Sequence, residues 1–299
     1  MTPSYEIIIF YKYTLIKDPE GCVRWQKKLC ERIGMYGRIL IAHEGINGTV
    51  EGTKEQIEEY CRHMHAQDGN EESFADFHDI WFKASPGTGT AFKKLKVKAR
   101  KEIVSTGLSK EENINPNELT GTHIEAEELK KWMEQKEEVE IIDMRNDYEY
   151  AVGHFAGSHK SGMKNFRDLQ AIAPQFNHLK NKKIVTVCTY GVRCEKASGY
   201  LKRQGFKDVY QLHGGIGTYM KKYPGKDFEG SLYVFDNRMT EQFTSSYDVI
   251  GSCTQCQQPS ERYGNCAWSE CHKQLIICSS CAQQSVWCSD VCQQKTEEI

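Results

Sequence analysis

A cysteine between an apolar run and a helix-like segment is the residue best suited to chemistry in this chain of 299 residues. Residues 184–187 are rich in β-branched side chains, which is typical of a buried strand, and the run ends at Cys188. Gly191 gives the backbone freedom to turn, and a helix is expected over residues 195–204. The amides before that helix and the charge of Arg193 both favour an anion on the sulfur. We therefore predict a reactive cysteine with a lowered pKa.

The rest of this loop is expected to surround the sulfur with amides that bind an anion. Its members between the cysteine and the arginine are Thr189, Tyr190, Gly191 and Val192. The alternative is an inert buried cysteine, which is common after a strand. Cys, Gly and Arg occurring together between strand and helix favour the reactive interpretation. Cys194 either resolves an oxidised Cys188 as a disulfide or caps the helix.

The elements around the cysteine predict a parallel sheet. Strands expected at residues 139–142, 183–187 and 209–212 alternate with helices at 126–135 and 195–204. Sites in such sheets lie at the carboxyl ends of the strands, where Cys188 and Asp143 both fall.

The first 90 or so residues predict a separate α+β sandwich. Strands are expected at residues 5–13, 38–42, 48–51 and 77–83, with helices at 19–35 and 53–66. The order βαββαβ is that of a ferredoxin-like fold. Thr53 and Gln56 are spaced as a capping box for the second helix. Glu44, in the glycine-containing turn between the middle strands, either faces a substrate or serves the turn alone.

A basic segment follows at residues 93–101, before a linker-like stretch at 105–120. If the segment is extended, four cations project from one side: Lys94, Lys96, Lys98 and Arg100. The favoured interpretation is a solvated edge strand, whose lysines discourage aggregation. The other is a strip that follows phosphates.

The end of the chain is rich in cysteine. The eight thiols there are Cys253, Cys256, Cys266, Cys271, Cys278, Cys281, Cys288 and Cys292. A stretch with so few aliphatic residues needs a metal to fold, which predicts one or two structural zinc ions. The spacing does not determine which cysteines pair, and His272 is a further candidate ligand. Iron–sulfur ligation is the alternative, but the spacings match no ferredoxin pattern.

Composition excludes several classes of protein. A net charge of −2 argues against a wholesale binder of polyanions, although a local basic patch remains compatible with nucleic acid. No apolar run approaches the roughly 20 residues of a membrane span. The first residues do not resemble a secretory signal. A cytoplasmic, reducing location is expected, which favours metal over disulfides for the clustered cysteines.

The pattern Cys188-x-x-Gly191-x-Arg193 resembles the active loop of rhodanese-domain sulfurtransferases. Residues 143–157 are similar to the rhodanese D-x-R…E…G-H-I-x-G stretch, which implies supporting roles for Asp143, Arg145 and Glu149. Residues 212–215 resemble the family's L-x-G-G. Rhodanese-like phosphatases have a loop one residue longer, so the resemblance implies a ring sized for sulfur.

A wider resemblance covers nearly the whole chain. Residues 188–197 are similar to the Cys-Thr-Gly-Gly-Ile-Arg-Cys-Glu-Lys-Ala segment of the bacterial tRNA wobble-uridine 5-hydroxylases. Residues 42–50, 96–104 and 235–238 also resemble segments of that family, whose members have a ferredoxin-like amino-terminal domain and a cysteine-rich tail. Tyr190 departs from the pattern, since the family usually has glycine there.

This resemblance implies an enzyme that hydroxylates uridine 34 of tRNA at carbon 5, with molecular oxygen as co-substrate. Cys188, Arg193 and Cys194 would be catalytic, and the anticodon arm would be the partner. The cations Lys94, Lys96, Lys98, Arg100 and Lys101 would bind RNA. No flavin or haem motif is seen. The implied organisation is a ferredoxin-like domain at 1–92, the basic segment and linker at 93–120, a rhodanese domain at 121–230 and a cysteine-rich region at 231–299.

Two other functions remain open from the sequence. The loop is equally suited to a sulfurtransferase that works through a Cys188 persulfide, although sulfur transfer needs neither the first domain nor the tail. A zinc-stabilised RNA-binding module with a vestigial loop is the third hypothesis, suggested by Tyr190.

Overall fold

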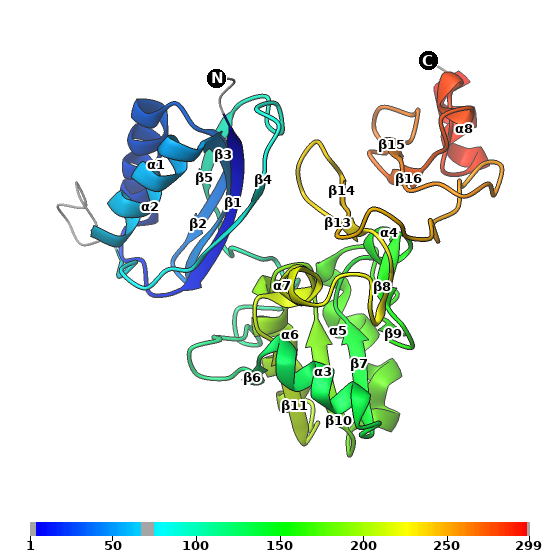
Figure 1. Ribbon diagram of the computed structural model, residues 1–299, viewed down its shortest axis with the longest axis horizontal. Helices are drawn as coiled ribbons and strands as arrows, with labels where there is room; N and C mark the ends of the chain where they lie inside the picture. The colour runs from blue at the N-terminus through cyan, green and yellow to red at the C-terminus, as the bar shows by residue number, and fades with distance from the viewer. Residues whose placement is uncertain (1–3, 67–74, 298–299) are drawn as a thin grey trace. The chain divides into compact units, whose positions relative to one another are not determined.

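The computed structural model describes residues 4–66 and 75–297, which form two compact units (Figure 1). One unit runs up to Thr120 and includes Phe235–Arg238. The other runs from Gly121 to Val234 and resumes at Met239. None of the helices in these ranges is long and apolar enough to cross a membrane.

The first unit is a five-stranded sheet in the order β4-β1-β3-β2-β5. Its strands are β1 (Tyr5–Tyr13), β2 (Tyr36–Ala42), β3 (Gly45–Thr53), β4 (Phe82–Pro86) and β5 (Leu95–Ala99), and its helices are α1 (Pro19–Ile33) and α2 (Lys54–Ala66). The first four strands pair antiparallel in the ferredoxin-like order that the sequence predicted. The basic segment is β5, which pairs parallel with β2 at the edge of this sheet.

Both helices cover one face of this sheet and begin at side-chain caps. Asp18 accepts a hydrogen bond of 3.0 Å from the amide of Gly21 at the start of α1. The capping box of α2 is confirmed, since the amide of Thr53 donates to Gln56 at 2.7 Å and the amide of Gln56 donates to Thr53 at 3.3 Å. The core is formed by the apolar faces of the helices and alternate strand residues, Phe10 among them.

Two predicted boundaries in this unit were wrong. The last strand starts at Phe82 instead of residue 77, because the preceding segment turns with the Ile80 amide bonded to the Phe77 carbonyl at 3.0 Å. The middle turn is shorter than expected, so Asn47 lies within β3. Glu44 accepts a hydrogen bond of 2.8 Å from the Ile103 amide, and Asn47 donates one of 3.2 Å to the Ile103 carbonyl. These side chains anchor the chain that leaves β5.

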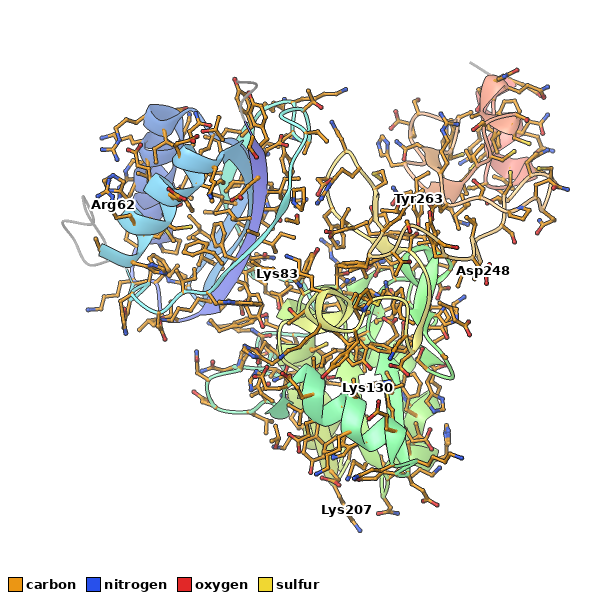
Figure 2. The ribbon with its side chains drawn as sticks, in the orientation of Figure 1. Arg62, Lys83, Lys130, Lys207, Asp248 and Tyr263 are labelled. Carbon is orange, nitrogen blue, oxygen red and sulfur yellow. The ribbon has the colours of Figure 1, made fainter. Side chains whose placement is uncertain are left out.

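The second unit has the predicted parallel sheet, in the order β6-β11-β10-β7-β9. Its strands are β6 (Thr122–Ile124), β7 (Val139–Asp143), β9 (His159–Lys160), β10 (Lys183–Val187) and β11 (Asp208–Leu212). The main helices are α3 (Ala126–Glu134), α6 (Val192–Arg203) and α7 (Gly215–Lys222), with short α4 (Asp147–Tyr150) and α5 (Leu169–Ile172) between strands. Lys130 on α3 and Lys207 before β11 mark this unit in Figure 2.

The rest of the second unit includes short antiparallel strand pairs and one α-helix, besides the 3-10 helices at Phe166–Asp168, Ala173–Leu179 and Cys281–Gln283. The strand pairs are β8 (Gly153–Phe155) with β12 (Phe228–Gly230), β13 (Leu232–Tyr233) with β14 (Thr240–Glu241), and β15 (Tyr263–Asn265) with β16 (Gln274–Ile276), and the α-helix is α8 (Asp290–Glu297). The apolar cluster of the tail is small and includes Cys266 and Cys292 among its buried members. So little apolar burial favours stabilisation by metal.

Candidate active site

Cys188 lies directly after β10, at the carboxyl end of the parallel sheet. The helix that follows starts at Val192, three residues before the predicted start at Glu195, so that boundary was wrong. Gly191 has a φ of 99° and turns the chain straight into α6. Because residues from Arg193 to Leu201 are all buried, the sequence lacks the amphipathic pattern that marks a helix start. Arg193 and Cys194 therefore belong to the first turn of α6.

The start of α7 supports the Cys188 loop through backbone hydrogen bonds. The amide of Ile216 donates to the Cys188 carbonyl at 2.9 Å, and the amide of Gly217 donates to the Thr189 carbonyl at 3.0 Å. Gly215 has a φ of 67°, and a Cβ there would lie 2.5 Å from the Cys188 carbonyl oxygen. Gly215, the first residue of α7, is thus required for the close approach of this helix to the loop.

Hydrogen bonds and a positive charge converge on the Cys188 sulfur. The Gly191 amide donates to it at 3.2 Å. Burial raises the pKa of Cys188, but the hydrogen bond from the Cys194 thiol, the charge of Arg193 and the first amides of α6 outweigh burial and lower this pKa to about 6. Burial and the neighbouring Cys188 raise the pKa of Cys194. Cys194 therefore keeps its proton and donates a hydrogen bond to the Cys188 thiolate.

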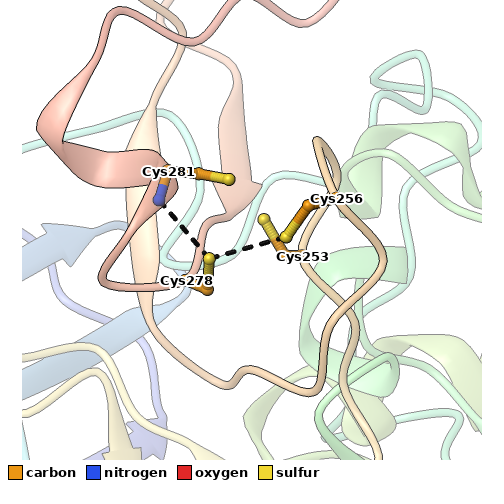
Figure 3. A group of neighbouring side chains, drawn as sticks. All are labelled: Cys253, Cys256, Cys278 and Cys281. Carbon is orange, nitrogen blue, oxygen red and sulfur yellow. Dashed lines mark hydrogen bonds between the residues drawn. The ribbon is translucent and has the colours of Figure 1, made fainter.

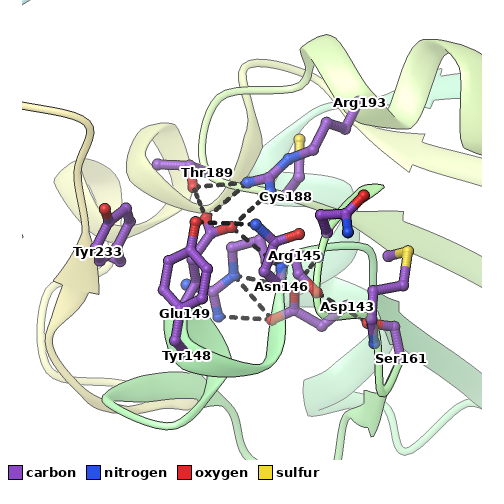
Figure 4. Close-up of polar contacts among 12 residues, drawn as sticks. Asp143, Arg145, Asn146, Tyr148, Glu149, Ser161, Cys188, Thr189, Arg193 and Tyr233 are labelled. Atoms are coloured by element: carbon purple, nitrogen blue, oxygen red, sulfur yellow. Dashed lines mark hydrogen bonds and ion pairs between the residues drawn. The ribbon is translucent and has the colours of Figure 1, made fainter. Parts of the chain in front are cut away.

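A buried ion pair fixes Arg193 (Figure 4). Its Nη1 lies 2.6 Å from Glu149 Oε1 and its Nη2 lies 2.8 Å from Glu149 Oε2, a bidentate arrangement. Thr189 Oγ1 accepts a further hydrogen bond from Nη2 at 3.3 Å. The guanidinium thus donates hydrogen bonds to Glu149 and Thr189, while its charge lowers the pKa of Cys188 as the sequence predicted.

A second buried pair joins Asp143 to Arg145. Arg145 Nη2 lies 2.6 Å from Asp143 Oδ2 and donates to the Gly153 carbonyl, also at 2.6 Å. Both side chains are buried. The pair ties the end of β7 to the start of β8. Asp143, Arg145 and Glu149, the three supporting residues expected from the sequence, therefore converge beside the loop.

The structure adds tyrosines that the sequence did not indicate. Tyr148, Tyr233 and Tyr263 pack edge to face, with ring centroids 5.1 to 6.3 Å apart. The hydroxyl of Tyr263 donates to the Tyr148 carbonyl at 2.5 Å, which links the tail to α4. Tyr190 extends to β14 and donates to Glu241 at 3.0 Å. These contacts join segments that lie far apart in the chain, so no local sequence pattern predicts them.

The loop is enclosed. Cys188 is 1% exposed, Thr189 2% and Tyr190 7%. A substrate reaches the sulfur only after the side chains that cover it move. Such a closed site keeps water from a reactive thiolate.

The eight tail cysteines form two groups (Figure 3 shows the first). The first group is Cys253, Cys256, Cys278 and Cys281, and the second is Cys266, Cys271, Cys288 and Cys292. Within each group the sulfurs lie within 4.8 Å of one another, and the bonded pairs are 3.5 to 3.6 Å apart. Four thiolates around a tetrahedral zinc at 2.3 Å lie about 3.8 Å apart, so both groups fit a metal ion. His272 belongs to neither group.

The two groups interleave along the chain. The first and third cysteine pairs form one group, and the second and fourth pairs form the other. Amides also donate to the sulfurs, as from Cys281 to Cys278 at 3.4 Å and from Cys288 to Cys266 at 3.4 Å. Such bonds stabilise thiolates.

The basic residues lie in the first unit, on and around β5. Lys94, Lys96, Lys98, Arg100 and Lys101 are all exposed. The predicted alternation of β5 is confirmed, since Leu95, Val97 and Ala99 are partly buried between them.

Comparison with known proteins identifies each part of the chain. Family models match residues 5–103 as "UPF0176 acylphosphatase like domain", 125–222 as "Rhodanese-like domain" and 229–293 as "Rhodanase C-terminal". The chain is 44% identical to the tRNA uridine(34) hydroxylase of Bacillus licheniformis, over 93% of this chain and 84% of that protein. It is 43% identical to proteins of the same name from Oceanobacillus iheyensis, over 91% of this chain and 83% of the relative, and from Staphylococcus aureus, over 92% and 84%.

Alkylation of Cys188 by iodoacetamide should follow the lowered pKa. Only the thiolate reacts, so the rate should rise with pH through a midpoint near 6, well below the value of about 8.5 for a free thiol. Cys194→Ala removes the thiol donor and should move the midpoint upward, whereas Cys194→Ser keeps a donor and should move it less. Mass spectrometry of peptides resolves each cysteine.

Cys61 is an internal control, because burial raises its pKa to about 11. Its modification should increase only at much higher pH. A Cys188 midpoint near that of a free thiol would show that the loop does not stabilise the anion.

Glu149→Gln should destabilise the second unit by about 3–5 kcal/mol, because it leaves the Arg193 charge buried without a counterion. The matched control is Glu137→Gln, which breaks the partly exposed 2.6 Å pair with Lys183 and should cost about 1 kcal/mol or less. Thermal and urea unfolding measure both. Equal effects of the two substitutions would contradict a structural role for the buried pair.

Proposed function

Because this chain belongs to the family of the tRNA uridine(34) hydroxylases, we propose that it hydroxylates carbon 5 of the wobble uridine of tRNA, with molecular oxygen as co-substrate. The observation that carries the proposal is the stabilised thiolate of Cys188 in a rhodanese-like loop. We assign the catalytic roles to Cys188, Arg193 and Cys194. The loop that binds an anion is assigned to Thr189, Tyr190, Gly191 and Val192.

The thiolate acts by covalent catalysis. Its sulfur adds to carbon 6 of uracil, which makes carbon 5 nucleophilic. Carbon 5 takes one oxygen atom derived from molecular oxygen, and an external two-electron reductant together with two protons from solvent converts the other atom to water. Loss of the proton from carbon 5 and release of the sulfur restore the ring.

The surrounding groups keep the sulfur ready for this addition. The Gly191 amide and the Cys194 thiol hold the thiolate as hydrogen-bond donors. The charge of Arg193 stabilises the same anion before addition and after release, and Glu149 keeps that guanidinium in place. Asp143 and Arg145 position the adjacent chain and make no direct contribution to the chemistry.

The substrate is a nucleic acid held by cations of the first unit. We propose that Lys94, Lys96, Lys98, Arg100 and Lys101 contact phosphates of the anticodon arm in the cytoplasm. Their exposure on and around one edge strand supports this assignment. A local basic strip also fits a chain whose net charge is −2.

The tail is proposed to hold two structural zinc ions, one in each group of four cysteines. Four thiolates without an open position suit a structural and not a catalytic zinc. When bound, the ions supply cross-links to a segment with a small apolar cluster.

Loss of the chain's gene should remove 5-hydroxyuridine-derived nucleosides from tRNA, as measured by mass spectrometry of digested tRNA. Cys188→Ala should fail to restore them and should lower turnover in vitro by about 10³-fold or more, the scale seen when a nucleophile is removed. Cys61→Ala, on α2, is the matched control and should restore them. Full hydroxylation by Cys188→Ala would refute the mechanism. Sulfur transfer from thiosulfate to cyanide, with tRNA unchanged in the deletion strain, would replace it with sulfurtransferase activity.

The purified chain should contain two zinc ions by elemental mass spectrometry. Cys253→Ser and Cys266→Ser should each lose one ion, because they belong to different groups. Cys61→Ser should retain both. Removal of zinc by a chelator should also change the circular dichroism spectrum of the purified chain, because the tail loses its cross-links. This readout does not depend on enzyme activity. A variant that carries both substitutions should lose both ions. If it still held one ion, Cys253 and Cys266 would belong to the same site, which would contradict the interleaved pairing.

A further inference from the structure

Strands β2 and β5 give the first sheet an open face with an unusual composition. The helices cover the other face of this sheet (Figure 1). Alternate residues of both strands, such as Ile39 and Val97, belong to the core beneath them. Of the remaining residues, Ala42 at the end of β2 is buried, and the others lie on the open face. They are Tyr36, Arg38 and Leu40 on β2, and Lys96 and Lys98 on β5, which together form what we call the β2–β5 patch.

The register places like charges side by side in this patch. Arg38 pairs with Lys96 across the two strands, and Leu40 pairs with Lys98. Like charges on neighbouring strands repel each other, which costs stability. Within residues 4–66 and 75–297, neither Arg38 nor Lys96 has an acidic partner. An arrangement that costs stability and lacks internal compensation indicates an external anion.

The neighbouring strand does not compensate the charge. On β3, Thr49 pairs with Arg38 and Asn47 with Leu40, and both are neutral. Glu51 pairs with Tyr36 but is 3% exposed, and its oxygens accept hydrogen bonds of 2.8 Å from the amides of residues 88, 89 and 91. The patch therefore keeps its positive potential.

Tyr36 adds an aromatic surface to the cations. Its side chain is 52% exposed, and no ring contact or hydrogen bond engages it within the described chain. An exposed ring beside arginine and lysine is suited to stacking on a nucleic-acid base, since every base presents a π-face. Paired bases are stacked inside a duplex and unavailable to such a ring, so the tyrosine selects unpaired nucleotides.

From this geometry we propose that the β2–β5 patch binds unpaired nucleotides of RNA, with Tyr36 stacking on a base and Arg38, Lys96 and Lys98 contacting phosphates. The inference rests on the proposed function in that it names the part of the RNA that the first unit recognises. It assigns a binding role to Tyr36 and Arg38, which the basic strip alone does not include.

The test compares two probes by fluorescence anisotropy with the full chain. One probe is an anticodon stem–loop RNA, and the other is a blunt RNA duplex with the same number of phosphates. Wild type should prefer the stem–loop. Tyr36→Leu should weaken stem–loop binding about tenfold and leave duplex binding unchanged, while Tyr36→Phe should bind as wild type.

The cations are tested through salt dependence. Arg38→Gln and Lys96→Gln should each reduce the slope of log affinity against log salt by about 0.7, the value for one single-strand phosphate contact. Lys28→Gln is the matched control, because Lys28 is exposed on α1 over the other face of the sheet. It should leave affinity and slope unchanged.

Equal weakening of both probes by Tyr36→Leu, or wild-type binding by Tyr36→Leu and Arg38→Gln, would overturn the inference. Nucleoside analysis of tRNA separates this failure from that of the proposed function. If the modification is made while the variants bind normally, only the patch is wrong. If the patch binds RNA as expected and no 5-hydroxyuridine forms, the hydroxylase function is wrong and the patch stands.

Discussion

The buried pair of Glu149 and Arg193 is the interaction on which the active loop depends. Both side chains are almost inaccessible to water, so neither charge is tolerable without the other. Glu149 belongs to α4 and Arg193 to the first turn of α6, so the pair fixes the start of the helix that follows Cys188. The position of the helix in turn sets the amides around the sulfur. A single ion pair thus connects packing to the electrostatics of the loop.

The chemistry of Cys188 follows from a balance of opposing effects. Burial alone would keep the thiol protonated, as it does for Cys22 and Cys30, whose pKa values rise to about 12. At Cys188 the same burial strengthens two interactions that favour the thiolate, the hydrogen bond from Cys194 and the attraction to the positive charge of Arg193. The enclosed loop therefore stabilises an anion where an ordinary core would suppress one.

The cysteine-rich tail and the first unit differ in how they are stabilised. The tail buries little apolar surface. Its two interleaved groups of thiols suit metal ions, which would cross-link the segment in place of a large core. The hydroxyl of Tyr263 joins this tail to α4 next to Glu149, so order in the tail supports the loop. The first unit has a large core, and on its open sheet face Arg38 lies beside Lys96.

The sequence by itself determined the features that depend on local patterns. Alternating and helical periodicities predicted both sheets, Thr53 and Gln56 predicted a cap, and Cys188, Gly191 and Arg193 predicted the loop. Only the tertiary structure decided that Arg193 binds Glu149, that the cysteines interleave, and that Arg38 lies beside Lys96. It also decided that α6 starts at Val192, because burial on every side of that helix erased its periodicity. The physical reason is that these contacts join segments far apart in the chain, and their energies appear only when the fold brings them together.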